Sequence, residues 1–209
     1  MALALNIVFV PADETFWVAL NRSEKIAEKY PTCFQLAEHT EVPHMTLYKV
    51  TVPEYNLLPL QDAVQGVVGN NFLLNVPHYK FSFKTVSTGR GYVFAEIDMD
   101  DALREFEAMI VKAAHPFRDP RAFPPGRGRL TEAELYNNRQ YGHWNVLDTW
   151  KPHMTITRLK DETMGTVVAE ELQRDTRFQQ VGFQLGTVRL YKTGNHGTCR
   201  ELVDEFLIA

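Results

Sequence analysis

Residues 43–47 read Pro-His-Met-Thr-Leu, and residues 152–156 read Pro-His-Met-Thr-Ile. Each phrase is followed, two positions further on, by a basic side chain, Lys49 or Arg158. A bare His-x-Thr recurs easily by chance in a chain of 209 residues, but the string Pro-His-Met-Thr does not. The repeat therefore indicates a duplicated unit with a matched histidine and threonine in each copy.

The segments around the two phrases repeat in the same order. A strand-like run and a helical pattern precede each phrase, at 3–10 and 15–30 in the first half and at 92–97 and 100–114 in the second. A second helical pattern and a long strand-like run follow it, at 57–68 and 72–86 in the first half and at 163–175 and 178–191 in the second. Each half therefore predicts a β-α-β-α-β unit.

Two such units predict an α+β fold in a single bilobal domain over residues 1–209. We expect lobe 1 at about 1–88 and lobe 2 at about 89–209, with two antiparallel-type sheets and outer helices around a central cleft.

The second half is longer by about twenty residues within 116–150, a stretch rich in Pro, Gly and Arg that predicts a long loop. Such a loop is either a lid or binding loop over the cleft or a solvated surface excursion. Within it, Arg127 and Arg129 are candidates for holding a second phosphate. The candidates for stacking on a base are aromatic: Phe123, Tyr136, Tyr141 and Trp144.

Composition narrows the class of protein. A formal net charge of −4 argues against an extended nucleic-acid-binding surface, which needs excess basic charge, but is compatible with a local basic pocket. Cys33 and Cys199 have neither metal-ligand spacing nor a disulfide framework, so we expect reduced thiols and a cytoplasmic location. The apolar run 1–10 lacks a basic start and is cut off by Pro11, so it predicts a buried strand, and no membrane segment is expected.

Strand geometry predicts which side chains share a face. Because side chains alternate along a strand, His44 and Thr46 lie on one face and the apolar residues between and after them on the other. The same holds for His153 and Thr155. If a pseudo-twofold axis relates the two halves, both polar pairs face one cleft.

The same alternation places the flanking residues. Tyr48 continues along the face of His44 and is expected at the rim of the site, where it would bind substrate. Lys49 and Arg158 fall on the opposite face and are expected to lie outside the site. A third His-x-Thr, at 196–198, lies in a Gly- and Asn-rich cluster that predicts a turn without a catalytic role.

Two facing histidines and two hydroxyls suit acid–base chemistry on a phosphate. The ordinary pKa of imidazole allows one histidine to be neutral and the other protonated near pH 7. The neutral ring takes a proton from the attacking hydroxyl or water, and the protonated ring gives one to the leaving oxygen. Threonine hydroxyls then hold the non-bridging oxygens, on which negative charge grows.

The paired His-x-Thr phrases resemble those of the two-histidine (2H) phosphoesterase superfamily, which includes 2′-5′ RNA ligase-like proteins and 2′,3′-cyclic nucleotide phosphodiesterases. The resemblance implies a bilobal fold and a hydrolase that needs no metal or other cofactor. It implies that His44 and His153 are the acid–base pair and that Thr46 and Thr155 hold the phosphate. The implied substrate is a nucleotide or short RNA with a 2′,3′-cyclic phosphate or a 2′-5′ phosphodiester. The long stretch 116–150 departs from the superfamily plan.

Other functions remain open at this point. A metal hydrolase would use histidines as ligands, but Val42-Pro43 prevents His39, Glu41 and His44 from sharing a helix face. A non-catalytic nucleotide or RNA-end binder would keep the fold, although binding alone does not require two titratable histidines. RNA 2′-5′ ligation and degradation of cyclic oligonucleotide signals would use the same motifs.

Overall fold

The computed structural model describes residues 1–70, 79–122 and 130–207. Its strands are β1 (Ala2–Pro11), β2 (Thr32–Phe34), β3 (Met45–Pro53), β4 (Lys80–Phe81), β5 (Phe83–Gly89), β6 (Tyr92–Ile97), β7 (His153–Leu159), β8 (Phe183–Thr193) and β9 (Cys199–Phe206). Its α-helices are α1 (Asp13–Lys29), α2 (Leu57–Gly69), α3 (Asp101–Ala114), α4 (Glu132–Tyr141), α5 (Gly165–Arg174) and α6 (Thr176–Val181).

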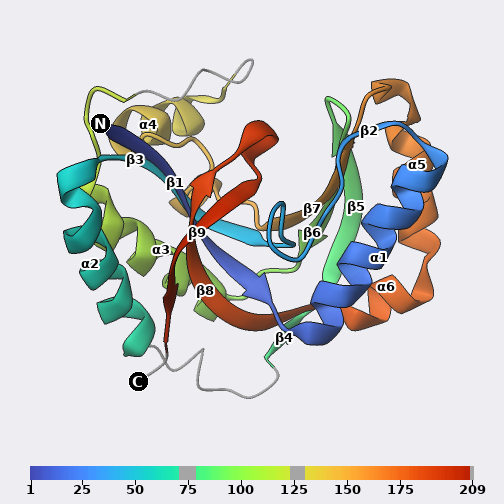
Figure 1. The fold of residues 1–209 in the computed structure, drawn as a ribbon, viewed down its shortest axis with the longest axis horizontal. Helices are drawn as coiled ribbons and strands as arrows, with labels where there is room; N and C mark the ends of the chain where they lie inside the picture. The colour runs from blue at the N-terminus through green and yellow to red at the C-terminus, as the bar shows by residue number, and fades with distance from the viewer. Residues whose placement is uncertain (71–78, 123–129, 208–209) are drawn as a thin grey trace.

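The described strands form one nine-stranded antiparallel sheet in the order β4-β8-β1-β3-β7-β6-β5, with β2 paired to β7 and β9 to β8. Figure 1 shows α2 and α3 at one end of this sheet and α1, α5 and α6 at the other. The α+β class is therefore confirmed. The expectation of two sheets is wrong, because β3 and β7 pair with each other through Met45 and Met154 and make the sheet continuous.

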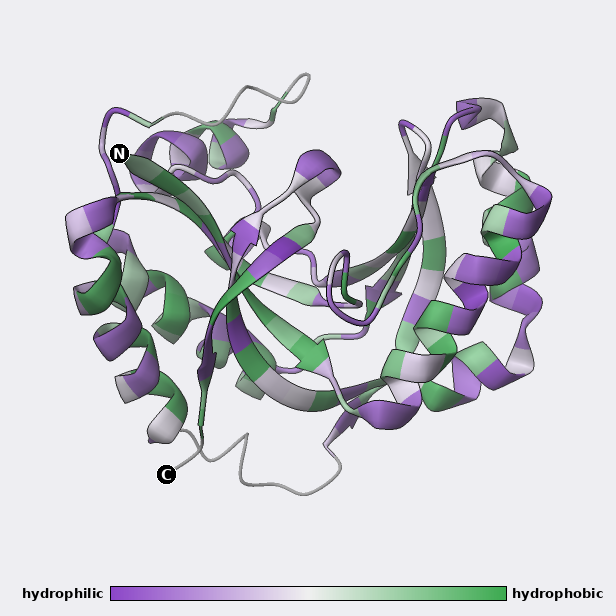
Figure 2. Ribbon diagram, in the orientation of Figure 1, coloured by the Kyte–Doolittle hydropathy of each residue, from purple (hydrophilic) through white to green (hydrophobic). Residues whose placement is uncertain are grey.

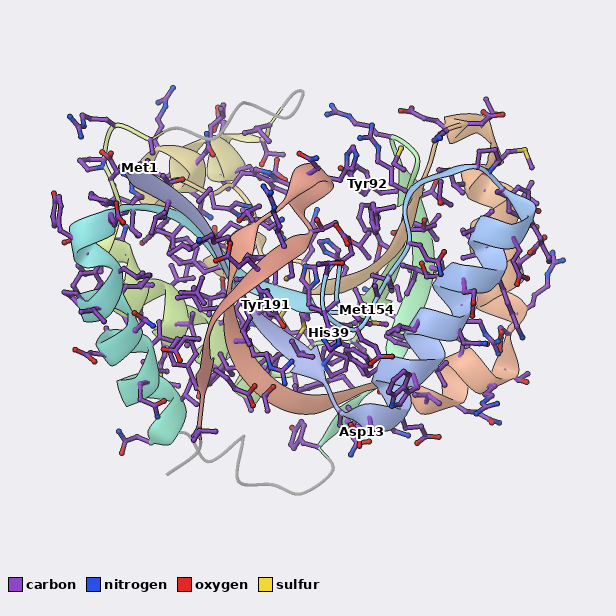
Figure 3. The ribbon with its side chains drawn as sticks, viewed as in Figure 1. Met1, Asp13, His39, Tyr92, Met154 and Tyr191 are labelled. Carbon is purple, nitrogen blue, oxygen red and sulfur yellow. The ribbon has the colours of Figure 1, made fainter. Side chains whose placement is uncertain are left out.

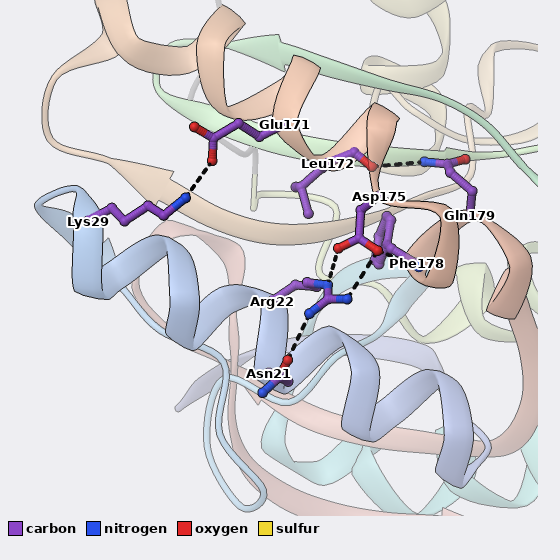
Figure 4. Close-up of polar contacts among 8 residues, drawn as sticks. All are labelled: Asn21, Arg22, Lys29, Glu171, Leu172, Asp175, Phe178 and Gln179. Carbon is purple, nitrogen blue, oxygen red and sulfur yellow. Dashed lines mark hydrogen bonds and ion pairs between the residues drawn. The ribbon is translucent and has the colours of Figure 1, made fainter.

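The two halves of this sheet do not coincide with residues 1–88 and 89–209. The last strand of each predicted unit pairs in the other half, since β5 lies against β6 and β8 lies against β1. Helix α1 likewise crosses over to pack against β7. Two ion pairs tie it there, from Arg22 to Asp175 and from Lys29 to Glu171 (Figure 4). An alternating pattern predicts a strand but does not name its partner, so this exchange could not be read from the sequence.

Most predicted elements are confirmed, but the run 178–191 is not one strand. Residues up to Val181 form α6, whose first turn is capped by Asp175 accepting a hydrogen bond from the backbone N–H of Phe178. Gly182, at φ +62°, ends the helix, and a Cβ there would lie 2.5 Å from the carbonyl oxygen of Phe81. Of the predicted run 72–86, residues 71–78 lie outside the described part of the chain.

The stretch 116–150 is not only loop, because it contains α4. Thr131 and Glu134 form a reciprocal capping box at its start, and Gly142 ends it in the left-handed conformation. This signature was visible in the sequence as Thr-x-x-Glu. Arg118 donates to the backbone of α4, and Arg121 pairs with Asp119. Residues 123–129, with Phe123, Arg127 and Arg129, lie outside the described residues.

The core lies between the sheet and its helices, and Figure 2 shows apolar residues on the inner faces of those helices. On β1, Phe9 faces α3 and stacks on Phe106 with ring centroids 5.1 Å apart. The opposite face of β1 carries Val8 and Val10, which are buried in a second, small apolar cluster with Val42, Tyr191 and Cys199. No helix in the described part of the chain is long and apolar enough to cross a membrane.

Candidate active site

Each phrase contains a β-bulge at the same position. In β3, Thr46 pairs with Val8 and Tyr48 pairs with Ile7, so Leu47 is an extra residue without a partner. In β7, Thr155 pairs with Phe94 and Thr157 pairs with Val93, so Ile156 is the extra residue. A bulge breaks the alternation of faces, because two residues on one strand oppose a single residue on the other.

The bulges change which residues reach the cleft side of the sheet. Tyr48, expected at the rim, is fully buried in the core, where its hydroxyl donates to the carbonyl oxygen of Tyr141. Lys49 and Arg158, expected on the opposite face, lie on the same face as Thr46 and Thr155 and are half-buried. Lys49 donates to the Gly197 carbonyl, and Arg158 to a ring nitrogen of His196. The alternation rule failed here because it assumes an uninterrupted strand.

Both histidine rings are held in the same way. The Nδ1 atom of His44 lies 2.7 Å from the carbonyl oxygen of Val42, and that of His153 lies 2.8 Å from the carbonyl oxygen of Lys151. A carbonyl oxygen only accepts hydrogen bonds, so Nδ1 is the nitrogen that carries the hydrogen. Nε2 is then the nitrogen at which each ring gains or loses a proton.

The electrostatic environment makes His44 a neutral ring. Burial lowers the pKa of His44 to about 4, against a smaller opposing effect of the hydrogen bond to the Val42 carbonyl. Positive charge on Lys49 and His153 lowers this pKa further. At neutral pH His44 is therefore uncharged and able to accept a proton.

The pairing of β3 with β7 brings the two phrases together. Because Met45 pairs with Met154 in antiparallel register, His44 is aligned with Thr155, and Thr46 with His153. All four of these polar side chains are half-buried, whereas both methionines are fully buried on the other face. The structure thus places the four motif residues beside one another on one side of the joint between the two halves.

The end of the stretch 116–150 supports the first phrase. The indole Nε1 of Trp150 donates to the carbonyl oxygen of Thr46, 3.1 Å away. The segment before Trp150 is held by Glu107, whose carboxylate accepts the backbone N–H of Leu147, and by Asn137, whose side-chain amide donates to the Val146 carbonyl. The loop therefore fixes the backbone of the first phrase.

The other predicted residues lie in different places. Tyr136 is exposed on α4, and Tyr141 packs its ring against His115 at 5.0 Å. Trp144 lines a cavity beside β6 and β7, together with Tyr92 and Phe94, which sequence reasoning missed. The segment 196–198 is in a turn, as predicted, with His196 at φ +61°. Within the described residues, no group of three or more His, Cys, Asp or Glu side chains is placed to hold a metal ion.

The chain is similar to one protein family and to solved structures. The family model described as the 2′-5′ RNA ligase superfamily matches residues 13–197. The Escherichia coli LigT structure complexed with phosphate is similar at 12% identity and a TM-score of 0.46, covering 100% of this chain and 98% of LigT. A structure described as a phosphoesterase is similar at 13% identity and a TM-score of 0.45, covering 100% and 99%. No curated protein sequence matches the chain.

The family match covers most of the chain and includes both His-x-Thr phrases. The chain therefore belongs to the 2′-5′ RNA ligase superfamily, a group of two-histidine (2H) phosphoesterases.

Proposed function

We propose that this protein is a phosphodiesterase that opens a 2′,3′-cyclic phosphate or cleaves a 2′-5′ phosphodiester, using His44 and His153 as general base and general acid. The observation that carries the proposal is the matched pair of histidines. Both have Nδ1 held by a backbone carbonyl two residues earlier, and each is aligned with the threonine of the other phrase.

The two histidines are not equivalent in their surroundings. His44 is neutral at neutral pH, because burial and the nearby charges of Lys49 and His153 lower its pKa. We therefore assign His44 as the base. His153 packs the edge of its ring against Phe94, with centroids 4.8 Å apart, and we assign it as the acid.

The reaction balances with these two groups and one water molecule. Nε2 of His44 takes a proton from water while the water oxygen forms a bond to phosphorus. The bond from phosphorus to a ribose oxygen breaks, and Nε2 of His153 gives that oxygen its proton. Thr46 and Thr155 donate hydrogen bonds to the non-bridging oxygens. Each positioned proton transfer contributes about 10² to 10⁴ in rate.

The proposed substrate is a nucleotide or a short RNA, and no metal or other cofactor takes part. RNA 2′-5′ ligation is the second candidate, since the superfamily is described by that activity. In it the 5′-hydroxyl takes the place of water: His44 takes its proton as its oxygen bonds to phosphorus, the bond from phosphorus to the 3′ oxygen breaks, and His153 protonates that oxygen. It predicts that a 5′-hydroxyl RNA and a 2′,3′-cyclic phosphate end are joined by the same two histidines.

The test is turnover of adenosine 2′,3′-cyclic phosphate in excess EDTA by the wild type, His44→Ala and His153→Ala. We expect product from the wild type and a loss of at least about a hundredfold in each variant. Activity abolished by EDTA, and lost also in His39→Ala, would assign the histidines to a metal site instead. Unchanged binding without any turnover of cyclic phosphate or of a 2′-5′-linked dinucleotide would indicate a non-catalytic binding protein.

A further inference from the structure

We propose that the cavity beside His153 binds a nucleobase together with the phosphate on its 5′ side, so that the preferred substrate is the end of an oligonucleotide. This inference rests on the proposed function and names its substrate class. The cavity has a volume of about 420 Å³ and is lined by Gly89, Arg90, Tyr92, Phe94, Trp144 and Arg158.

The cavity adjoins the candidate active site through Phe94, which lines it and contacts His153. Phe94 pairs with Thr155 across β6 and β7, and its ring contacts that of His153. Two residues earlier on β6, Tyr92 pairs with Arg158. A group bound in the cavity therefore lies beside the ring of His153.

Three aromatic rings form the walls of this cavity. The rings of Tyr92 and Phe94 are nearly parallel, at 9°, with centroids 5.6 Å apart. Trp144 faces the cavity from the loop that Glu107 and Asn137 hold in place. All three side chains are half-buried and belong to neither apolar core cluster, so packing of the core does not explain them. Flat, partly exposed rings of this kind bind nucleobases by stacking.

Arg158 supplies a guanidinium that is held in place before any ligand arrives. Its Nε donates to the carbonyl oxygen of Arg90 at 3.3 Å, and its Nη1 donates to Nδ1 of His196 at 2.8 Å. The guanidinium carbon lies 4.9 Å from the centre of the Tyr92 ring, which Figure 3 shows beside the β8–β9 turn. The side chains of Arg90 and Arg158 both line the cavity, and paired guanidinium groups favour a phosphate.

The other half of the sheet offers an internal comparison. On β1, Val8 pairs with Thr46 and Asn6 pairs with Lys49. These two residues therefore occupy the positions that correspond to Phe94 and Tyr92 on β6. Both are buried, and Tyr191 and Cys199 cover that face. Among the described residues at these matched positions, the His153 side has an open aromatic wall and the His44 side does not, and this asymmetry gives the bound substrate a direction.

The orientation of the substrate determines which of its groups enters the cavity. His153, as the acid, protonates the ribose oxygen that leaves phosphorus, so the cavity beside it receives the base of that same ribose. The phosphate on the 5′ side of this nucleoside then meets Arg158. A mononucleoside cyclic phosphate has the base but lacks this second phosphate, whereas an oligonucleotide end has both.

The test compares three substrates with the same reacting group. They are ribose 2′,3′-cyclic phosphate without a base, adenosine 2′,3′-cyclic phosphate, and a diadenosine dinucleotide with a 2′,3′-cyclic phosphate end. For the wild type we expect kcat/KM to rise at least fivefold at each step. Trp144→Ala removes the first gain, so that its kcat/KM for adenosine 2′,3′-cyclic phosphate is no higher than its kcat/KM for the base-free substrate. Arg158→Gln removes the second gain, and Arg158→Lys restores part of it.

Trp17→Ala is the matched control, because Trp17 is a half-exposed indole on α1 that does not line this cavity. Thermal melting of each variant separates misfolding from loss of binding. Equal kcat/KM for all three substrates in an active wild type would overturn the subsite and leave the proposed function standing.

Absence of turnover on all three substrates would contradict the proposed function instead. The subsite is then tested by calorimetric binding of the 3′-phosphorylated dinucleotide against adenosine 3′-phosphate. Wild-type binding that is at least fivefold tighter for the dinucleotide, and weakened in Arg158→Gln, supports it. Equal binding of the two ligands contradicts it.

Discussion

Met45 of β3 pairs directly with Met154 of β7, and in the described part of the chain this contact joins the two halves of the sheet. Both side chains are fully buried in the main core, while the histidine that precedes each one is half-buried on the opposite face of the sheet. The two catalytic candidates are therefore fixed to each other through backbone pairing and through a shared apolar layer below it.

Shortening either methionine should destabilise the protein and leave a cavity under the site. For Met45→Ala and Met154→Ala we expect the free energy of unfolding to fall by about 2 to 5 kcal/mol, the usual range for deleting a buried side chain of this size. Met→Leu at either position keeps the volume and should cost less than about 1.5 kcal/mol. Urea unfolding measures both, and equal losses for Ala and Leu would contradict a packing role.

Activity should persist well below the ordinary pKa of histidine. Burial lowers the pKa of His44 to about 4, so the base stays neutral down to that region, and the acid side of the kcat/KM profile should fall near pH 4 rather than pH 6.5. Lys49→Met removes a positive charge that lowers this pKa, and the limb should then move to higher pH. The quantity to measure is the pH at which kcat/KM falls on the acid side of the profile, whatever the change in the maximal rate. Lys160→Met, at an exposed position, is the control.

The fully buried carboxyl group of Glu107 should make stability depend on pH. Burial raises its pKa from 4.5 to about 8, against a smaller lowering by the N–H of Leu147. Between these values the folded state holds a proton that the unfolded state lacks, so stability is greatest below about pH 4.5 and falls as pH rises towards 8. Each pKa unit corresponds to about 1.4 kcal/mol, and a loss of a few kcal/mol is expected.

Glu107→Gln keeps a hydrogen-bond acceptor for Leu147 but cannot ionise, so its stability should be flat over this range. Urea unfolding at pH 5, 7 and 9 compares the two proteins. Glu105→Gln, on the exposed side of the same helix, should keep the pH dependence of the wild type. A wild type whose stability does not fall between pH 5 and 9 would contradict this account.

Tyr48 should contribute to stability and not to substrate binding. Tyr48→Phe keeps the buried ring and removes the hydrogen bond to the Tyr141 carbonyl, which should cost about 1 to 3 kcal/mol because that carbonyl loses a buried partner. We expect KM and kcat to remain within about twofold, since the side chain is fully buried. A large rise in KM with no change in the free energy of unfolding would instead favour the position at the rim of the site that the sequence predicted for Tyr48.

The sequence was sufficient to predict the class of fold, most of the elements and the shared face of the four motif residues, whose roles stay a prediction. A repeated Pro-His-Met-Thr carries that information locally, through strand alternation and through the chemistry of imidazole. It did not predict the faces of Tyr48, Lys49 and Arg158, because a one-residue bulge leaves no compositional mark in an apolar strand.

The aromatic cavity was missed for a different reason. Tyr92 and Phe94 looked like ordinary alternating strand residues, and only their pairing with Arg158 and Thr155 places them at the site. His196 was correctly predicted in a turn, but the position of that turn against Arg158 depends on contacts between distant parts of the chain. The sequence pattern of one strand does not show which distant strand pairs with it.

The exchange of strands between the two halves has a consequence for biosynthesis. Strand β1 is made before both of its neighbours, β3 and β8, so one of its edges has no partner until residues beyond 183 have been made. At about 5 to 20 residues per second, that delay is on the order of ten seconds or longer. Throughout this interval a strand containing Leu5, Ile7 and Val8 offers an unpaired edge to other nascent chains, and translation speed and chaperone supply therefore bear directly on the yield of folded protein.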